Sequence, residues 1–490
     1  EGKRQSCNMN KLIQKYKTLP VQVRASAWFL ICSFLQKGIS MITTPIFTRL
    51  LTTQEYGEFN VFNSWLSIVT VFVTLNLYNG VFTRGLVKYE EDRDRYASAL
   101  QGMCTLCILI GFAIYGVAHD FWNHFFEMTT TQALLMFIMI WATAVFNFWS
   151  VSQRVDFKYR ALVIITLISS IAKPVLGIIL VRLADDKVTA RILGLALVEV
   201  VTCTGLFVAQ LRRGKTLYVK KYWVHALHFN LPLIPHYLSQ TVLNSSDRIM
   251  IQKMVSADAA GIYSLAYSIS QIMTIFNTAL LKTIEPWLYK KMKANRTQDI
   301  GRVAYLSLGL VAAVNLILIA LAPEAVAIFA PVQYHEAIWV IPPVAMGVYF
   351  MFAYTFFAVI EFYFEKTKYV TYATMSGAVL NIILNYICIK LFGYMAAGYT
   401  TLVCYMLYTV AHYCFAQKIC NEEMNGVRIY NLKTLLTITG AFMISGFLLM
   451  MTYNAPVIRY GLLVIAGVLA VLNRNKIIAL LKSLIAMKKA

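Results

Sequence analysis

The sequence predicts an all-α membrane protein that crosses the bilayer many times. Hydrophobic residues make up 59% of the 490 residues, charged residues make up only 14%, and the mean hydropathy is +0.62. A soluble chain of this length needs more charge to cover its surface. Apolar runs of about 20 residues, the length that spans a bilayer, recur along the chain. We expect about fourteen spans, near residues 25–48, 59–83, 97–118, 131–150, 161–182, 190–211, 225–250, 259–285, 302–322, 337–361, 369–389, 394–417, 432–452 and 455–473.

Membrane topology explains the net charge of +21 better than a nucleic-acid partner does. Most of the lysines and arginines gather in alternate loops, and loops of this kind stay on the cytoplasmic side of a membrane. Both termini are therefore expected in the cytoplasm. We predict a basic amphipathic segment over residues 1–23, at the inner membrane surface, and a basic tail over residues 474–490.

An internal repeat divides the chain into two halves. The segment that begins at Arg49 and contains Gly57 reappears 204 positions later, beginning at Lys253 and containing Gly261. Such duplications build many transporters from two related halves. We expect two equivalent lobes of six helices, and the remaining ranges as connections or additions. The predicted parts are an N-lobe over 24–212, a cytoplasmic linker over 213–224, a C-lobe over 225–418, a cytoplasmic loop over 419–431 and two extra spans over 432–473.

Two lysines fall near the middle of predicted spans in the first half. Lys37 shares a helical face with small hydroxyl residues, and so does Lys173. A lysine at this depth costs several kcal/mol unless it faces water or a partner. Glu199 is the obvious internal counter-charge, because it is the lone acid at mid-depth nearby. The lysines therefore either line a cavity or form structural ion pairs.

Other polar residues gather on single faces of predicted spans. Asn76, Asn79 and Thr83 share a face of the second span, where they either hold helices together or line a pore, and Arg84 follows. In the seventh span His236, Gln240, Asn244 and Asp247 share a face. Arg248 is adjacent, so it and Asp247 either neutralise each other or act separately.

Two motifs are set aside. Cys104 and Cys107 form a CxxC in the middle of a predicted span, with no second pair, so core packing is favoured over metal binding or redox chemistry. Residues 209–216 fit the loosest phosphate-loop pattern. That loop needs a strand before it, and here it ends a membrane helix, so we expect no ATPase.

The motifs that carry a family resemblance lie in both halves. They are Pro45-Ile46-Phe47-Thr48-Arg49, Glu55-Tyr56-Gly57-Glu58-Phe59, Leu231-Pro232-Leu233-Ile234-Pro235, Ser246-Asp247-Arg248 and Gly261-Ile262-Tyr263-Ser264. With them the chain resembles the polysaccharide-repeat flippases, the polysaccharide transporter family of the multidrug/oligosaccharidyl-lipid/polysaccharide (MOP) exporter superfamily. The resemblance covers most of residues 20–420.

The resemblance implies a fold and an activity. The two lobes would form a V around a central cavity, as in lipid II flippases, in which an added helix pair bounds a groove for the lipid tail. The protein would move a polyprenyl-pyrophosphate-linked oligosaccharide to the periplasmic or outer leaflet of the bacterial inner membrane, for O-antigen, capsule or exopolysaccharide synthesis. It would act as a monomer among membrane lipids, with a polysaccharide polymerase and chain-length proteins as partners.

An anionic, hydroxylated headgroup requires fixed cations and neutral polar groups in a wet cavity. The candidate residues for this binding site are Arg24, Lys37, Arg84, Lys173, Arg248, Lys282, Asn79, Gln240 and Asn244. Asp247, Glu199 and Glu361 are candidates for coupling to a proton gradient, a sodium gradient or the membrane potential. No cofactor, metal or ATP is expected.

Three alternatives remain open. A cation-coupled multidrug exporter of the same superfamily would favour an acidic or aromatic cavity, which Lys37 and Lys173 argue against. A lipid II flippase would share the chemistry of a pyrophosphate-linked sugar. A polytopic glycosyltransferase or polysaccharide polymerase would need large loops with catalytic carboxylates, and the predicted loops are short.

Overall fold

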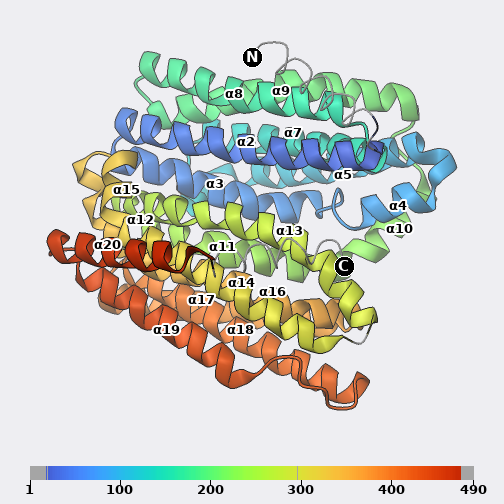
Figure 1. The fold of residues 1–490 in the computed structure, drawn as a ribbon. Coiled ribbons are helices and arrows are strands. Elements are labelled where there is room, and N and C mark those ends of the chain that lie inside the picture. The colour runs from blue at the N-terminus through green and yellow to red at the C-terminus, as the bar shows by residue number, and fades with distance from the viewer. Residues whose placement is uncertain (1–17, 19, 295, 476–490) are drawn as a thin grey trace, which may run out of the picture. The chain divides into compact units, whose positions relative to one another are not determined.

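The computed structural model describes residues 18, 20–294 and 296–475, and the secondary structure of these residues is helical throughout (Figure 1). Most of the predicted N-terminal segment 1–23 and nearly all of the predicted tail 474–490 lie outside the described residues. The helices of the first half are α2 (Val21–Leu50), α3 (Thr53–Thr74), α4 (Val81–Lys88), η1 (Glu90–Asp92), α5 (Arg93–Val117), α6 (His119–Phe126), α7 (Thr130–Val155), α8 (Tyr159–Leu183), α9 (Lys187–Gly214) and α10 (Lys220–Asn230).

The second half continues with the same kinds of element. Its helices are η2 (Leu231–Leu233), α11 (Ile234–Met254), α12 (Ala257–Ser270), α13 (Ile272–Lys293), α14 (Thr297–Ala320), α15 (Ala322–Phe329), η3 (Val332–Trp339), α16 (Ile341–Tyr363), α17 (Thr367–Phe392), α18 (Ala396–Glu423), α19 (Leu432–Met451) and α20 (Pro456–Leu472). The all-α fold class is confirmed.

Ten helical segments of the described chain are long and apolar enough to cross a membrane. Every predicted span contains at least one helix, but the predicted number of fourteen is not confirmed. Helix α11 is absent from the ten because polar residues such as Gln240, Asn244 and Asp247 interrupt its apolar sequence. Helix α20 is apolar but has only 17 residues.

Three predicted spans are interrupted. The span expected over 59–83 ends with α3 at Thr74, because Leu75 and Asn76 adopt positive φ angles of 50° and 52°. The prediction that Asn76, Asn79 and Thr83 share one helical face is therefore wrong. The span expected over 225–250 breaks at η2, where Pro232 has no N–H to continue the helix, and the span expected over 259–285 breaks at Gln271.

The helix ends preserve the sequence offset. Helix α2 ends at Leu50 and α11 ends 204 positions later at Met254, while α3 begins at Thr53 and α12 begins at Ala257. The order of later helices also repeats, with α5 to α9 followed in the second half by α14 to α18. Superposition of 24–212 on 225–418 stays a prediction.

Contacts divide the chain into two units. Unit 1 contains the chain up to Leu50 together with Trp65–Leu238, and unit 2 contains Leu51–Ser64 and the chain from Ser239 onward. The start of α3 therefore packs with the second half of the sequence. The predicted extents of the lobes and of the linker 213–224 remain predictions.

In unit 2 the starts of α3 and α12 meet at equivalent glycines. A Cβ added to Gly57 would lie 1.9 Å from the carbonyl oxygen of Ala257, and one added to Gly261 would lie 2.1 Å from that of Thr53. The Thr53 hydroxyl also donates to the Asp258 carboxylate. The repeated motif thus keeps glycine where two backbones touch.

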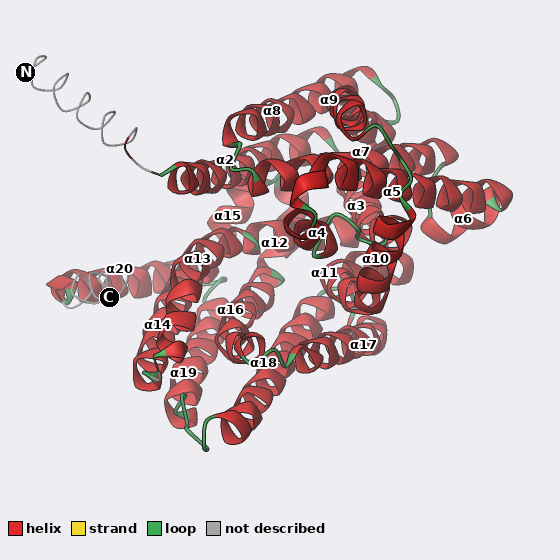
Figure 2. Cartoon of the chain, turned by 90° about the vertical axis from the view of Figure 1, so that its right-hand side faces the viewer, coloured by secondary structure: helices red, strands yellow, loops and turns green. Residues whose placement is uncertain are grey.

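The two additional helices pack on the outside of unit 2. Helix α19 lies beside α14 and α16 (Figure 2), where the Phe442 ring packs at a tilt against Tyr349 with ring centroids 4.4 Å apart. Helix α20 is held to α15 by an ion pair between Arg459, which is 3% exposed, and Glu324. No pattern in the sequence predicts this buried charge.

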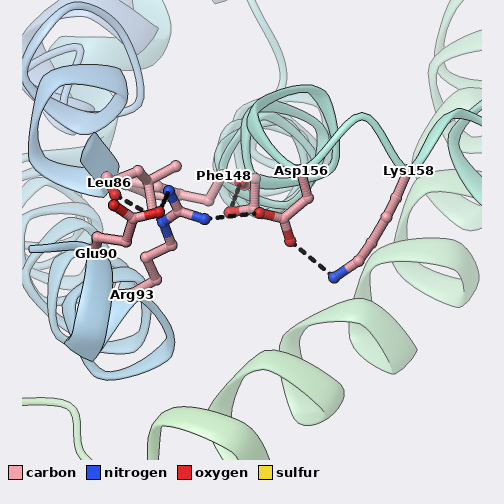
Figure 3. Close-up of polar contacts among 7 residues, drawn as sticks. Leu86, Glu90, Arg93, Phe148, Asp156 and Lys158 are labelled. Atoms are coloured by element: carbon pink, nitrogen blue, oxygen red, sulfur yellow. Dashed lines mark hydrogen bonds and ion pairs between the residues drawn. The ribbon is translucent and has the colours of Figure 1, made fainter. Parts of the chain in front are cut away.

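In unit 1 a charged cluster joins the ends of four elements (Figure 3). The Arg93 guanidinium donates to the Leu86 carbonyl at 2.8 Å, to Glu90 at 3.0 Å and to Asp156 at 3.2 Å. Lys158 donates to the other oxygen of Asp156 at 2.7 Å. The cluster fixes the end of α7 against the start of α5, so cations in these loops stabilise the fold.

The glycine contact gives a test of the fold. Gly57→Ala and Gly261→Ala should each destabilise the protein by about 1–3 kcal/mol, the usual range for overpacking a tight contact. Gly309→Ala on α14 is the control, because nothing lies within 4 Å of an added Cβ there. Thermal unfolding in detergent measures the difference. Equal melting temperatures for all three variants would contradict the close approach of α3 and α12.

Candidate buried-charge sites of the two units

In unit 1 helices α8 and α9 form an antiparallel hairpin with a close contact. A Cβ added to Gly194 would lie 2.8 Å from the Cα of Gly177 on α8. Since the helices run in opposite directions, the residue four before Gly177 faces residues just after Gly194. This geometry places Lys173 opposite Glu199.

The Lys173 Nζ lies 2.6 Å from Oε1 of Glu199, and the two side chains are 32% and 13% exposed. Both border a cavity of about 190 Å³ that is also lined by Gln36, Thr166 and Ser170. The Oε2 atom of Glu199 is buried with no hydrogen-bond partner among the described residues. The cavity has room for a few water molecules, at about 30 Å³ each, and is too small for an oligosaccharide.

Of the two alternatives for the lysines, an internal ion pair therefore describes Lys173. Lys37 differs, because it is exposed on α2 and the neighbouring Gln36 is the residue that lines the cavity. The hydroxyl groups on the same stretch donate to backbone carbonyls, as Thr44 does to Ser40 at 2.9 Å. Arg24 is half-buried near the start of α2.

In unit 2 a buried carboxylate is held by neutral groups alone. Asp247 on α11 is 1% exposed. It accepts hydrogen bonds from Tyr263 at 2.6 Å, Asn385 at 2.6 Å and Thr401 at 2.8 Å. These donors come from α12, α17 and α18, so four helices meet at one carboxylate. Asn381 supports the network by accepting from Asn385 at 3.2 Å.

Asp247 forms no ion pair within the described part of the chain. The side chain of its neighbour Arg248 contacts other groups. Its guanidinium lies 4.2 Å from the centre of the Tyr267 ring and donates a 3.0 Å hydrogen bond to the Asn244 carbonyl. Asp247 and Arg248 therefore form no direct ion pair among the described residues, although the guanidinium still acts on the carboxylate electrostatically. A buried carboxylate with polar oxygens around it and no directly paired cation is suited to accept a proton or a small hard cation.

The polar face of the seventh predicted span includes Asp247, but the sequence pattern predicts none of its partners. The sequence signal for these partners was the pair Asn381 and Asn385, which lie one turn apart in an apolar helix. Tyr263 and Thr401 gave none, because single hydroxyl groups are common in membrane helices.

The remaining candidates in unit 2 lie on exposed surface. Gln240 and Asn244 are exposed on α11, and the Asn244 side-chain oxygen accepts from Tyr405 at 3.1 Å. Lys282 is exposed on α13. Gln240, Asn244 and Arg248 follow one another at single-turn spacing, so they form one polar stripe beside the Asp247 network.

Two candidates in unit 1 have structural roles. Asn79 donates to Asn76 at 2.6 Å in the turn between α3 and α4, and Asn230 donates to the carbonyl of Asn76 at 2.9 Å. Arg84 on α4 lies 4.9 Å from the centre of the Phe229 ring. These contacts join the turn and α4 to the segment around α10.

Glu361 forms a second buried site in unit 2, with His412 of α18. Both side chains are fully buried, and His412 Nδ1 lies 2.6 Å from Glu361 Oε1. The rings of Tyr354 and Tyr408 pack on the imidazole, with centroids 5.2 Å and 4.4 Å away. The second oxygen of Glu361 and Nε2 of His412 have no hydrogen-bond partner among the described residues. Glu361 and His412 therefore form a buried polar pair that joins α16 to α18.

Solved structures with a similar fold are membrane transporters. The lipid II flippase MurJ in an inward closed conformation matches with a TM-score of 0.67 and 14% identity, over 91% of this chain and 99% of that chain. An inward-facing multidrug resistance MATE family transporter of the MOP superfamily matches with a TM-score of 0.61 and 13% identity, over 80% of this chain and 96% of that chain. The fold is that of the MOP-superfamily transporters.

The sequence comparisons identify the family within that class. Residues 23–292, more than half of the chain, match the family described as "Polysaccharide biosynthesis protein". An uncharacterized membrane protein of Haemophilus influenzae is 21% identical over 370 residues, which cover 73% of this chain and 88% of the relative. The chain belongs to the polysaccharide biosynthesis protein family, and it is a multi-pass membrane protein. The resemblance found in the sequence is confirmed at this level.

The Lys173–Glu199 pair can be tested by a double-mutant cycle. Lys173→Met leaves a partly buried carboxylate without its cation, and we expect a loss of about 1–3 kcal/mol, less than the cost for a fully buried pair because the lysine is partly exposed. Adding Glu199→Gln should restore most of the stability. Lys390→Met, at an exposed position on α17, controls for the lost charge. A stable single variant that loses transport, with no rescue by Glu199→Gln, would instead place Lys173 at the substrate.

Proposed function

We propose that the protein is a flippase that moves a polyprenyl-pyrophosphate-linked oligosaccharide from the cytoplasmic to the outer leaflet of the bacterial inner membrane. Membership of the polysaccharide biosynthesis family, together with a fold shared with a lipid II flippase, supports this proposal. Both termini would lie in the cytoplasm, and a polymerase and chain-length proteins would receive the product. The product would enter O-antigen, capsule or exopolysaccharide synthesis.

The proposed headgroup contacts are cations of the two units that are exposed or half-buried. Lys37 in unit 1 and Arg248 and Lys282 in unit 2 supply charge for a pyrophosphate, and Arg24 and Arg84 add to it. Gln240 and Asn244 lie along the same helix as Arg248, so neutral donors for sugar hydroxyls stand beside a phosphate-binding cation. Lys173 and Asn79 are weaker candidates, since their polar groups are engaged within unit 1.

Transport is proposed to be coupled to an ion at Asp247. The negative charge of the carboxylate has no direct ion-pair partner among the described residues, and its hydrogen-bond donors come from three other helices. Binding of a proton or sodium ion would remove that charge and change the forces between α11, α12, α17 and α18. The Glu361–His412 pair is a second candidate, and Glu199 is the least suited because Lys173 already compensates it.

The substrate is tested by reconstitution. Proteoliposomes that carry the protein should move a fluorescent polyprenyl-pyrophosphate-linked oligosaccharide across the bilayer, as measured by quenching with a membrane-impermeant reagent. Movement of a hydrophobic cationic drug and not of the lipid-linked sugar would assign the multidrug alternative, and movement of lipid II alone would assign the lipid II alternative. Sugar polymerisation by the purified protein would support the enzyme alternative.

Coupling is tested in the same liposomes. Asp247→Asn should abolish flipping driven by a proton or sodium gradient, while binding of the labelled lipid to the variant persists. Asp185→Asn, at an exposed position between α8 and α9, is the matched control and should retain driven flipping. Wild-type rates of driven flipping in Asp247→Asn would remove this carboxylate from the mechanism.

A further inference from the structure

Unit 2 contains a large basic pocket where α14 begins, α18 ends and α19 begins. Its volume is about 850 Å³, and its polar lining includes Gln298, Arg302, Tyr305, Gln417, Arg428 and Lys433. None of these residues belongs to the proposed transport or coupling sites. The residues come from two helix starts, one helix end and the segment between α18 and α19 (Figure 2).

The segment between α18 and α19 is anchored by buried side chains and by hydrogen bonds. Ile429 and Tyr430 are buried, and the Tyr430 hydroxyl donates to the Phe356 carbonyl at 2.8 Å. The Ile429 carbonyl approaches α14 at Gly301, where an added Cβ would lie 2.6 Å from its oxygen. The backbone N–H of Asn431 donates to the Tyr305 hydroxyl. The wall of the pocket is therefore fixed, and Arg428 and Lys433 flank the anchor as exposed cations.

The positive charge of the pocket has no internal counter-ion. Arg302, Arg428 and Lys433 make no ion pair within the described residues. The carboxylates on the same segments bind other lysines. Asp299 pairs with Lys291 at 3.2 Å, Glu422 with Lys418 at 4.0 Å and Glu423 with Lys366 at 2.9 Å. The start of α19 adds the partial positive charge of a helix N-terminus.

The pocket also lies at a defined depth. Helices α14 and α19 are both apolar and of membrane-spanning length, and the pocket is formed where both begin. Phosphate headgroups occupy the same level at a membrane surface, and basic pockets between helices are suited to bind them. Arginine forks match phosphate oxygens in bidentate geometry, and Gln298, Gln417 and Tyr305 supply neutral donors.

We propose that this pocket binds a phosphate headgroup, supplied by an anionic phospholipid of the surrounding membrane. The three cations hold the phosphate, and the bound lipid joins the α18–α19 connection to the start of α14. The site stabilises unit 2 and attaches the two additional helices. This proposal does not depend on the identity of the transported substrate, so it can be tested independently of the proposed flippase activity.

The test measures lipid binding and stability in nanodiscs. The wild type should have a higher melting temperature in phosphatidylglycerol than in phosphatidylcholine, and native mass spectrometry should show retained phosphatidylglycerol. The triple variant Arg302→Gln, Arg428→Gln, Lys433→Gln should lose the temperature difference and about tenfold in lipid retention. The charge-matched control Lys290→Gln, Lys293→Gln, Arg296→Gln changes exposed cations outside the pocket and should behave as the wild type.

Further arms identify the source of the phosphate. Inorganic phosphate added to phosphatidylcholine nanodiscs should not raise the melting temperature as phosphatidylglycerol does. If phosphate raises the melting temperature of the wild type equally, and the triple variant loses this effect, the lipid assignment is overturned and the pocket is a site for soluble phosphate. An unchanged lipid effect in the triple variant would overturn the site altogether. If the triple variant does not fold, Arg428→Gln, a single exposed change, replaces it, and unchanged lipid retention in that variant also counts against the site.

Discussion

The carboxylate of Asp247 imposes a constraint that the rest of unit 2 satisfies. A charge removed from water costs several kcal/mol unless hydrogen bonds or an opposite charge replace its hydration. Here Tyr263, Asn385 and Thr401 replace it, each from a different helix. Helices α11, α12, α17 and α18 must keep their register for the three bonds to form together. The charge has no direct ion-pair partner among the described residues, so an ion that binds there acts on the packing of four helices at once.

The two units compensate an acidic side chain in their interior in different ways. In unit 1 the buried acid Glu199 is neutralised by Lys173, and the Gly177–Gly194 contact brings their helices close enough. In unit 2 Asp247 has only neutral hydrogen-bond partners, and Glu361 pairs with His412. The two halves therefore share the offset of their helix ends, and the equivalent glycines Gly57 and Gly261 lie in contact, but the electrostatics of the two units differ. This asymmetry is why we place ion coupling in unit 2.

Sequence patterns predicted those features that depend on local or repeated chemistry. The all-α class and the 204-residue offset between equivalent helix ends follow from composition and from a repeated motif. The Lys173–Glu199 pair was foreseeable because one acid lay at the right depth. The break after Thr74 was not foreseeable, because Leu75 carries no turn signal. Asn230, which is far away in sequence, holds the turn by donating to the Leu75 carbonyl. Thr401 and the Arg459–Glu324 pair were missed for the same reason: their contacts join distant segments.

The most direct test of this account is the dependence of stability on ions. A bound ion raises the free energy of unfolding with the logarithm of its concentration. Thermal unfolding of the purified protein should be followed across sodium concentration and pH, for the wild type, Asp247→Asn and Asp185→Asn. The account predicts that the melting temperature of the wild type and of Asp185→Asn responds to one of these ions and that Asp247→Asn loses that response. A response of the same size in Asp247→Asn would contradict it.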